Sequence, residues 1–170
     1  MGKTFVISGG AGFIGSHLCE RLVAEGNRVF CVDNFITGRV DNIASLKNDP
    51  NFELTEHDVS KPLIIPDKVD LIFHFASPAS PIDFVELAIQ ILKVGALGSH
   101  NLLGMARAKS AKFVLASTSE VYGDPEEHPQ TEKYWGNVNP IGIRSCYDEG
   151  KRCAESLFVN YHKQNGVKIK

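Results

Sequence analysis

Two side chains that could transfer a proton stand four residues apart near the end of the sequence. Tyr147 and Lys151 fall in a predicted helix over residues 147–164, where a spacing of four places them on one face. An ammonium group near a phenol favours the phenolate, and so lowers the tyrosine pKa from its ordinary value of about 10. A phenolate can take the proton of a substrate hydroxyl. The pair by itself also fits two exposed helix residues, so its meaning depends on what lies nearby.

Hydroxyl and carboxyl groups follow the predicted strand over residues 112–117. Thr118 comes first, and Ser119 and Glu120 follow directly. In parallel α/β sheets, ligands bind outside the carboxyl ends of the strands, so these groups face the expected crevice. Thr118 could hold a reacting oxygen beside the tyrosine, whereas Glu120 could also be a solvated loop acid.

A glycine-rich turn joins the first predicted strand, residues 4–8, to a predicted helix over residues 12–25. Gly9, Gly12 and Gly15 recur at intervals of three. This pattern gives a tight turn, a backbone without Cβ atoms where a pyrophosphate can approach, and close contact between helix and strand. The N-terminus of the helix adds unpaired N–H groups and the positive end of its dipole. The glycines alone also fit a merely tight turn.

An acidic residue ends the second predicted strand, residues 28–33. At that position the Asp33 carboxylate can bind the ribose hydroxyls of an adenosine, and it would repel a 2′-phosphate. The order of strand, glycine turn, helix, strand and acid therefore predicts a dinucleotide site that favours NAD over NADP. Arg39 could offset that preference in part.

Two further segments could contact the same cofactor. Asp58, at the end of the third predicted strand, could accept a hydrogen bond from the adenine amino group or cap a turn. Ala76 and Ser77 end the fourth predicted strand, where a dinucleotide would cross the sheet. Residues 77–81 could equally form a structural turn.

These candidates lie on an alternation of strands and helices along the whole chain. Such alternation predicts βαβ units, right-handed crossovers and a parallel sheet, hence an α/β fold. Charged residues in the third strand indicate a sheet edge. The predicted strands cover residues 4–8, 28–33, 52–58, 69–76 and 112–117, the predicted helices residues 12–25, 83–108 and 147–164, and one long loop residues 123–144.

Composition excludes several classes of function. The 170 residues, 43% of them hydrophobic, fit one globular domain, and the net charge of −2 gives no attraction to nucleic acid or an anionic membrane. No apolar stretch approaches the roughly 20 residues that cross a bilayer. The four cysteines lack CxxC spacing and the six histidines are scattered, so we expect no metal site. Reduced thiols, with Cys19 and Cys31 in the core, favour a cytoplasmic protein.

The chemistry-bearing residues together resemble the extended short-chain dehydrogenase/reductase family of nucleotide-sugar enzymes. The order of the glycine turn, Asp33, Thr118 and Tyr147-x-x-x-Lys151 carries this resemblance. Longer strings are similar to the members of the family that decarboxylate their substrate. They are residues 33–39 (DNFITGR), 74–81 (HFASPASP), 117–125 (STSEVYGDP), 134–142 (YWGNVNPIG) and 147–152 (YDEGKR).

The resemblance implies a Rossmann-type doubly wound sheet of strand order 3-2-1-4-5-6 and conversion of UDP-glucuronate to UDP-xylose through a 4-keto intermediate. Tyr147 would be the base, supported by Lys151 and Thr118, while Ser119 and Glu120 would contact the sugar. The cofactor contacts that it implies, besides the glycines and the tyrosine–lysine pair, are Phe13, Ile14, Asp33, Asn34, Thr37, Gly38, Asp58, Val59, Ser77, Lys93 and Thr118.

Other functions remain open. An NAD-dependent 4-epimerase or 4,6-dehydratase shares the first oxidation, but dehydratases usually carry an Asp-Glu pair where this chain has Ser119-Glu120. Gly95 stands where many relatives have asparagine, which weakens an epimerase assignment. The chain could also be an NAD-binding module without turnover.

The resemblance also bears on the extent of the protein. We expect residues 1–170 to be the NAD-binding Rossmann domain of a longer enzyme, without the C-terminal substrate lobe and ending in the sixth strand. Relatives commonly dimerise through two helices, which predicts a homodimer through residues 83–108 and 147–164.

Overall fold

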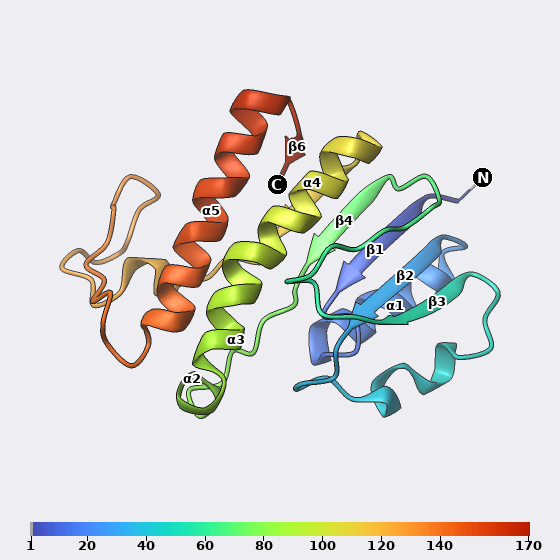
Figure 1. Ribbon diagram of the computed structural model, residues 1–170, viewed down its shortest axis with the longest axis horizontal. Helices are drawn as coiled ribbons and strands as arrows, with labels where there is room; N and C mark the ends of the chain where they lie inside the picture. The colour runs from blue at the N-terminus through green and yellow to red at the C-terminus, as the bar shows by residue number, and fades with distance from the viewer. Residues whose placement is uncertain (1) are drawn as a thin grey trace.

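In the computed structural model, which describes residues 2–170, six parallel strands form one sheet in the order β3-β2-β1-β4-β5-β6 (Figure 1). Neighbours pair in parallel throughout, and β1 lies between β2 and β4. The predicted doubly wound order is confirmed, with its switch point between β1 and β4. The strands are β1 (Thr4–Ser8), β2 (Arg28–Asp33), β3 (Phe52–Glu56), β4 (Leu71–His74), β5 (Lys112–Leu115) and β6 (Lys168–Ile169).

Burial explains the residue types of the strands. The central strand β1 is buried along most of its length, and the run Phe5 to Ser8 is therefore apolar almost throughout. The outer strand β3 has no buried residue, and its exposed positions are Glu53, Leu54 and Glu56. The predicted sheet edge is confirmed, because charged side chains keep such an edge in water.

Two hydrophobic clusters cover the two faces of the sheet. Side chains alternate along a strand, so Ile7 packs with Leu22 on one face while Val6 packs with Leu102 on the other. The first face is covered by α1 (Phe13–Ala24) and the 3-10 segment η1 (Val40–Leu46). The second is covered by α4 (Ser99–Lys109) and α5 (Ser145–Asn165), which lie side by side (Figure 1).

The predicted single helix over residues 83–108 is wrong in one respect, because the structure divides it. Leu87 leaves the helical conformation at φ −119°, and a wider π-helical turn interrupts the regular helix further on. At that turn Gly95 lies against α5, since a Cβ there would be 2.7 Å from the Cα of Gly150. The segments are α2 (Asp83–Glu86), α3 (Ala88–Lys93), η2 (Val94–Gly98) and α4.

The first helix, α1, leaves its first two apolar residues in solvent and buries later ones. Phe13 and Ile14 are 79% and 68% exposed, whereas Cys19, Leu22 and Val23 are buried. The turn between β1 and α1 is packed closely against the first helical turn, leaving no room for bulky side chains on that side. The expected burial of Cys19 and Cys31 is confirmed.

Between η3 (Ser119–Tyr122) and α5, the chain forms neither helix nor strand apart from one bridge that joins Gly123 to Asn137. The predicted loop over residues 123–144 is therefore confirmed for the described chain. None of the helices within residues 2–170 combines the length and apolarity needed to span a membrane.

Candidate functional site

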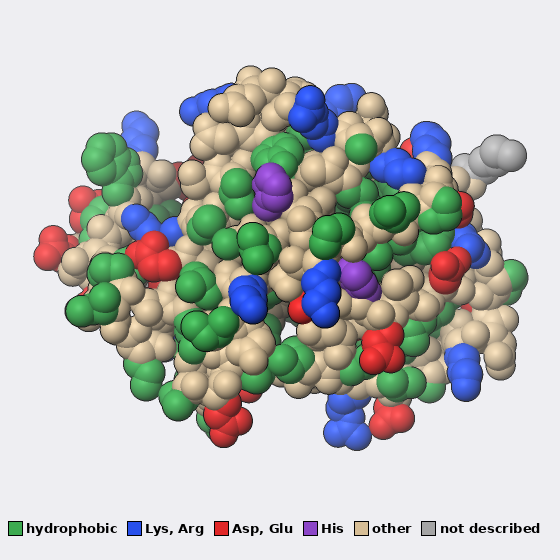
Figure 2. Space-filling model, in the orientation of Figure 1, with side chains coloured by type: hydrophobic (Ala, Val, Ile, Leu, Met, Phe, Trp, Pro, Cys, Tyr) green, Lys and Arg blue, Asp and Glu red, His purple; other side chains and the backbone are tan. Residues whose placement is uncertain are grey.

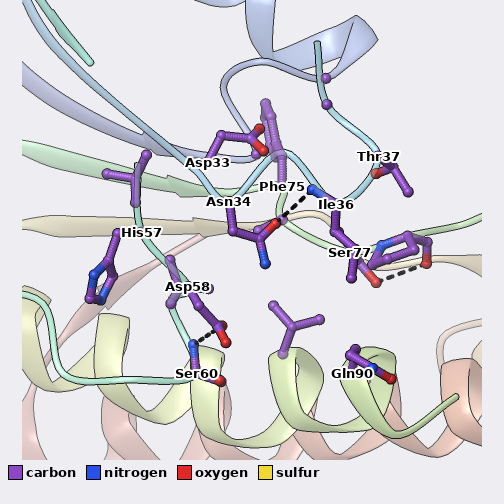
Figure 3. A pocket seen from close by; sticks show the side chains of 18 of the residues that line it. Asp33, Asn34, Ile36, Thr37, His57, Asp58, Ser60, Phe75, Ser77 and Gln90 are labelled. Carbon is purple, nitrogen blue, oxygen red and sulfur yellow. Dashed lines mark hydrogen bonds between the residues drawn. The ribbon is translucent and has the colours of Figure 1, made fainter. Parts of the chain in front are cut away.

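A cleft opens at the carboxyl ends of β1, β2 and β4, at the switch point of the sheet (Figure 3). It encloses about 820 Å³ of empty space, part of which is open to solvent. Side chains from the strand ends and from α3 face one another across it in Figure 3. Among its lining residues are Gly9, Gly12, Asp33, Asn34, Thr37, Gly38, Asp58, Val59, Ser77 and Lys93, all of which the sequence had suggested.

The glycine turn forms one wall of the cleft. Gly9 has φ +75°, a conformation that favours glycine, and a Cβ there would lie 2.7 Å from the backbone nitrogen of Ala76. A Cβ on Gly15 would lie 2.1 Å from the Gly9 carbonyl oxygen, so glycine is needed for close packing there. Gly12 caps α1 without any side-chain hydrogen bond, which leaves the N–H groups of the first helical turn for another acceptor.

The Asp33 carboxylate is held in place at the end of β2. It is only 8% exposed and accepts hydrogen bonds from the backbone N–H groups of Ala11 and Phe35, both at 2.9 Å. Gly38 lies against it, since a Cβ there would be 2.8 Å from Oδ1. A carboxylate has about four acceptor positions, so two remain for hydroxyl groups of a ligand.

The opposite wall comes from the segment after β3. Asp58 Oδ1 accepts a hydrogen bond from the Ser60 N–H at 2.9 Å, as Figure 3 shows. The side chain therefore caps a turn and lines the cleft, and the two interpretations of the sequence are compatible. His57 and Gln90 also line the cleft. Sequence reasoning missed both, because neither belongs to a motif.

The shape and chemistry of the cleft fit a dinucleotide. Close glycine packing opens a phosphate-sized approach to the start of α1, and a fixed carboxylate stands one strand away. Phe13 and Ile14 lie at the first turn of α1 outside the cleft lining, and Gly15 is buried behind the turn. Only the backbone of those three residues could serve such a ligand.

A second group of residues forms at the carboxyl end of β5. Lys151 is 7% exposed, and its Nζ donates a 2.8 Å hydrogen bond to the Ala116 carbonyl oxygen. The same Nζ lies 5.6 Å from the centroid of the Tyr147 ring. The structure thus places the predicted pair together, and burial lowers the pKa of Lys151 to about 8.

A buried histidine connects the two groups. Ala116 donates its N–H to the carbonyl oxygen of His74, the last residue of β4, at 3.2 Å. The His74 ring lies 2.7 Å from the Ser8 hydroxyl, measured at Nδ1. Burial, and secondarily the Lys151 charge, lower the pKa of His74 to about 3, so the ring is neutral and Ser8 can donate to it. The cleft and the lysine are thereby joined through adjacent strand ends.

The polar residues after β5 are also engaged. Thr118 caps η3, and its Oγ1 accepts a 3.3 Å hydrogen bond from the Glu120 N–H. Ser119 is exposed. Glu120 forms an ion pair with Arg144, so it is not simply a solvated loop acid. Since η3 packs against α5, these three residues lie on the tyrosine side of the sheet end.

Two residues near the tyrosine were not found from the sequence. Phe84 stacks on Tyr147 with ring centroids 5.1 Å apart and planes 19° apart. The guanidinium of Arg144 also lies over the Phe84 ring, with its Cζ 5.4 Å from the ring centroid. A buried phenylalanine and a loop arginine are too common to signal a site, so only their neighbours reveal them.

No group of three or more potential metal-binding side chains lies together within residues 2–170.

The sequence profile of the GDP-mannose 4,6 dehydratase family matches residues 6–170. UDP-glucuronic acid decarboxylase 4 of Arabidopsis thaliana is 53% identical over 165 residues, which cover 97% of this chain and 37% of that protein. UDP-glucuronic acid decarboxylase 1 of Xenopus tropicalis is 54% identical over 168 residues, which cover 99% of this chain and 39% of the relative.

Solved structures agree on the fold. A UDP-galactose 4-epimerase matches 98% of this chain and 54% of its own, with a TM-score of 0.79 and 30% identity. A dTDP-glucose 4,6-dehydratase from Streptomyces venezuelae, solved with NAD and TYD, matches 98% of this chain and 53% of its own at a TM-score of 0.81 and 26% identity. The chain spans less than half the length of the curated relatives and about half of these structures. Because the family profile extends over nearly every residue, the chain belongs to the GDP-mannose 4,6-dehydratase family.

Proposed function

We propose that residues 1–170 form an NAD-binding Rossmann domain. The observation that carries this proposal is the Asp33 carboxylate, fixed by two backbone N–H groups beside a glycine turn that leaves the start of α1 open. The negative charge would repel the 2′-phosphate of NADP. Calorimetric titration with NAD and NADP tests this, and equal affinity for the two would contradict it.

We propose further that the parent protein converts UDP-glucuronate to UDP-xylose. The curated relatives at 53% and 54% identity are named UDP-glucuronic acid decarboxylases. Two contacts support the proposal: Lys151 lies near the Tyr147 ring, and Thr118 accepts a hydrogen bond from the Glu120 N–H. Bound NAD would supply a hydride acceptor for the sugar C4 and a donor for the later reduction. The net reaction is therefore a carboxy-lyase reaction.

The chain's own residues would move and hold protons. Tyr147 would take the proton of the C4 hydroxyl, and Lys151, charged below pH 8, would stabilise the phenolate that makes this possible. Thr118 would hold the reacting oxygen. The resulting β-keto acid loses CO₂ because the electrons of the breaking C–C bond flow into the adjacent carbonyl, while Ser119 and Glu120 would contact the sugar.

Incubation of the full-length enzyme with UDP-glucuronate tests the reaction. CO₂ and UDP-xylose are the expected products, and Tyr147→Phe should abolish both, with Tyr161→Phe on the same helix as a matched control. UDP-galacturonate without CO₂ would instead establish a 4-epimerase. NAD binding without any turnover of the 170-residue chain would identify this part as a cofactor-binding module.

We propose that the protein forms a homodimer through the segment of residues 83–108 together with the helix of residues 147–164. Large apolar side chains are exposed along the first segment, among them Val85, Ile89 and Leu92, and Figure 2 shows hydrophobic groups over this side of the molecule. Val85 stands on α2, while Ile89 and Leu92, three residues apart, lie on one side of α3. Sedimentation velocity tests the assembly, and a monomeric mass at high concentration would contradict it.

We also propose a cytoplasmic location. The four cysteines of the described chain are all free, and Cys19, Cys31 and Cys146 are buried as thiols. Free thiols are typical of a reducing compartment. Cell fractionation tests this proposal, and recovery from an oxidising compartment would contradict it.

A further inference from the structure

His74 contacts both the strand side and the helix side of the cofactor cleft from within the core. The residue is 3% exposed, so it can act on a bound cofactor only through its neighbours. Its ring lies at the end of β4, and Nδ1 is 2.7 Å from the Ser8 hydroxyl at the end of β1. The glycine turn begins with Gly9, directly after Ser8. This hydrogen bond therefore fixes the strand end from which the turn departs.

The same ring contacts the helix side of the cleft, where Lys93 and Val94 line it. A hydrogen bond joins the ring to the backbone of Val94, at which the π-helical turn η2 begins. The ring also packs against Gly98 of this turn, since a Cβ there would lie 3.7 Å from Cε1. With Nδ1 accepting from Ser8, the neutral ring carries its proton on Nε2, so one side chain holds both contacts at once.

A buried histidine is a costly way to fill the space between a sheet and a helix. Each ring nitrogen loses its hydrogen bonds to water on burial, and only partners inside the protein offset that loss. An apolar side chain would fill the same space without this cost. The polar ring is therefore worth its place only where the two bonds themselves matter, at Ser8 and at Val94.

We infer that His74 is a positioning residue for the cofactor, because it holds the strand side and the helix side of the cleft at a fixed separation. This inference rests on the proposed binding of NAD. A dinucleotide in the cleft has to contact both sides together, and a separation fixed beforehand lowers the entropy that binding costs. Without the ring, Ser8 and Val94 could shift independently, and the ligand would have to restore their spacing.

Calorimetric titration of the 170-residue chain with NAD tests the inference. His74→Leu removes both bonds and should weaken NAD binding about tenfold, the effect expected for one or two buried hydrogen bonds. His74→Asn, whose Oδ1 can replace Nδ1 as the acceptor for Ser8, should recover part of that loss. Ser8→Ala should weaken binding about threefold in the wild type and cause no further loss in the His74→Leu background, because its partner is already absent there.

Ser99→Ala is the matched control for Ser8→Ala. The Ser99 hydroxyl is also buried, but it has no hydrogen-bond partner within residues 2–170, so its removal should leave NAD affinity unchanged. Urea denaturation of the same variants measures stability separately from affinity. Lower stability with unchanged NAD affinity in His74→Leu would show that the ring only supports the core, and would overturn the inference.

Two further results would also overturn it. One is an equal loss of affinity from Ser8→Ala in the wild type and in the His74→Leu background. The other applies even where His74→Leu does not fold, and it is an equal NAD affinity of Ser8→Ala and Ser99→Ala. Failure of the proposed function is seen in a different sample, because a wild-type chain that does not bind NAD would overturn both proposals. Normal binding by the wild type and by every variant would overturn this inference alone.

Discussion

Replacement of Lys151 by methionine should stabilise the fold at neutral pH. Burial lowers the pKa of Lys151 from its ordinary 10.5 to about 8, so holding the charge inside the folded protein has a free-energy cost. At about 1.4 kcal/mol for each unit of pKa, this cost is about 3 kcal/mol. Methionine removes the charge, but it also removes the hydrogen bond to the Ala116 carbonyl oxygen. The loss of that bond destabilises the fold by about 1 kcal/mol and offsets part of the gain. The expected net stabilisation is about 2 kcal/mol at pH 7.

The pH dependence of this difference identifies its cause. Below pH 8 the lysine is protonated in both the folded and the unfolded chain, and the full cost applies. Between pH 8 and 10.5 the folded chain releases the proton while the unfolded chain keeps it, so wild-type stability rises with pH. The wild type should gain about 2 to 3 kcal/mol on the variant from pH 7 to pH 10, which would remove the variant's advantage.

Urea denaturation at several pH values between 6 and 10 measures both quantities. Lys163→Met, at an exposed position of the same helix, is the matched control and should show neither the stabilisation nor the pH dependence. A Lys151→Met variant that is less stable than wild type at pH 7, or a difference that does not change with pH, would refute the reasoning. The lysine would then be held in the fold at no electrostatic cost.

Three more predictions concern the cofactor cleft and the histidine beneath it. Asp33→Asn should weaken NAD binding about tenfold and leave NADP binding unchanged in calorimetry. An equal loss of affinity for both cofactors would show that the carboxylate does not select between them. Gly15→Ala should lower the free energy of unfolding by about 2 kcal/mol, because its Cβ would lie 2.1 Å from the Gly9 carbonyl oxygen. Gly104→Ala, whose Cβ would meet nothing closer than 3.8 Å, is its control and should be neutral or stabilising in the same urea titration. His74 has its pKa lowered to about 3, so between pH 6.5 and 3 the unfolded chain binds a proton that the folded chain does not. Stability should therefore fall by up to about 1.4 kcal/mol per pH unit as the pH drops, and His74→Gln should remove this part of the acid sensitivity in acid titrations followed by circular dichroism.

Local patterns predicted much of the fold and the cofactor half of the site. The glycine spacing and Asp33 could be read directly, because a tight turn, a helix start and a strand end are each defined by a few neighbouring residues. The alternation of strands and helices predicted a parallel sheet, and the family resemblance supplied the order of its strands. The cleft then brought together most of the residues named for it.

The interrupted helix shows where local patterns stop being sufficient. Residues 83–108 have helical spacing almost throughout, yet the chain leaves the regular helix at Leu87 and widens at Gly95. The widening at Gly95 depends on a distant part of the sequence, because Gly95 packs directly on Gly150 of α5. A contact between distant segments cannot be read from the periodicity of either one.

The sequence by itself determined which residues could do chemistry and on which elements they stand. Tertiary structure decided what surrounds them: Lys151 is buried against Ala116, Tyr147 stacks on Phe84, and Arg144 meets Glu120. The physical reason is that spacing along a helix or strand is fixed by local geometry. Burial, charge pairing and the pKa values that follow depend on distances between segments, which exist only once the chain has packed.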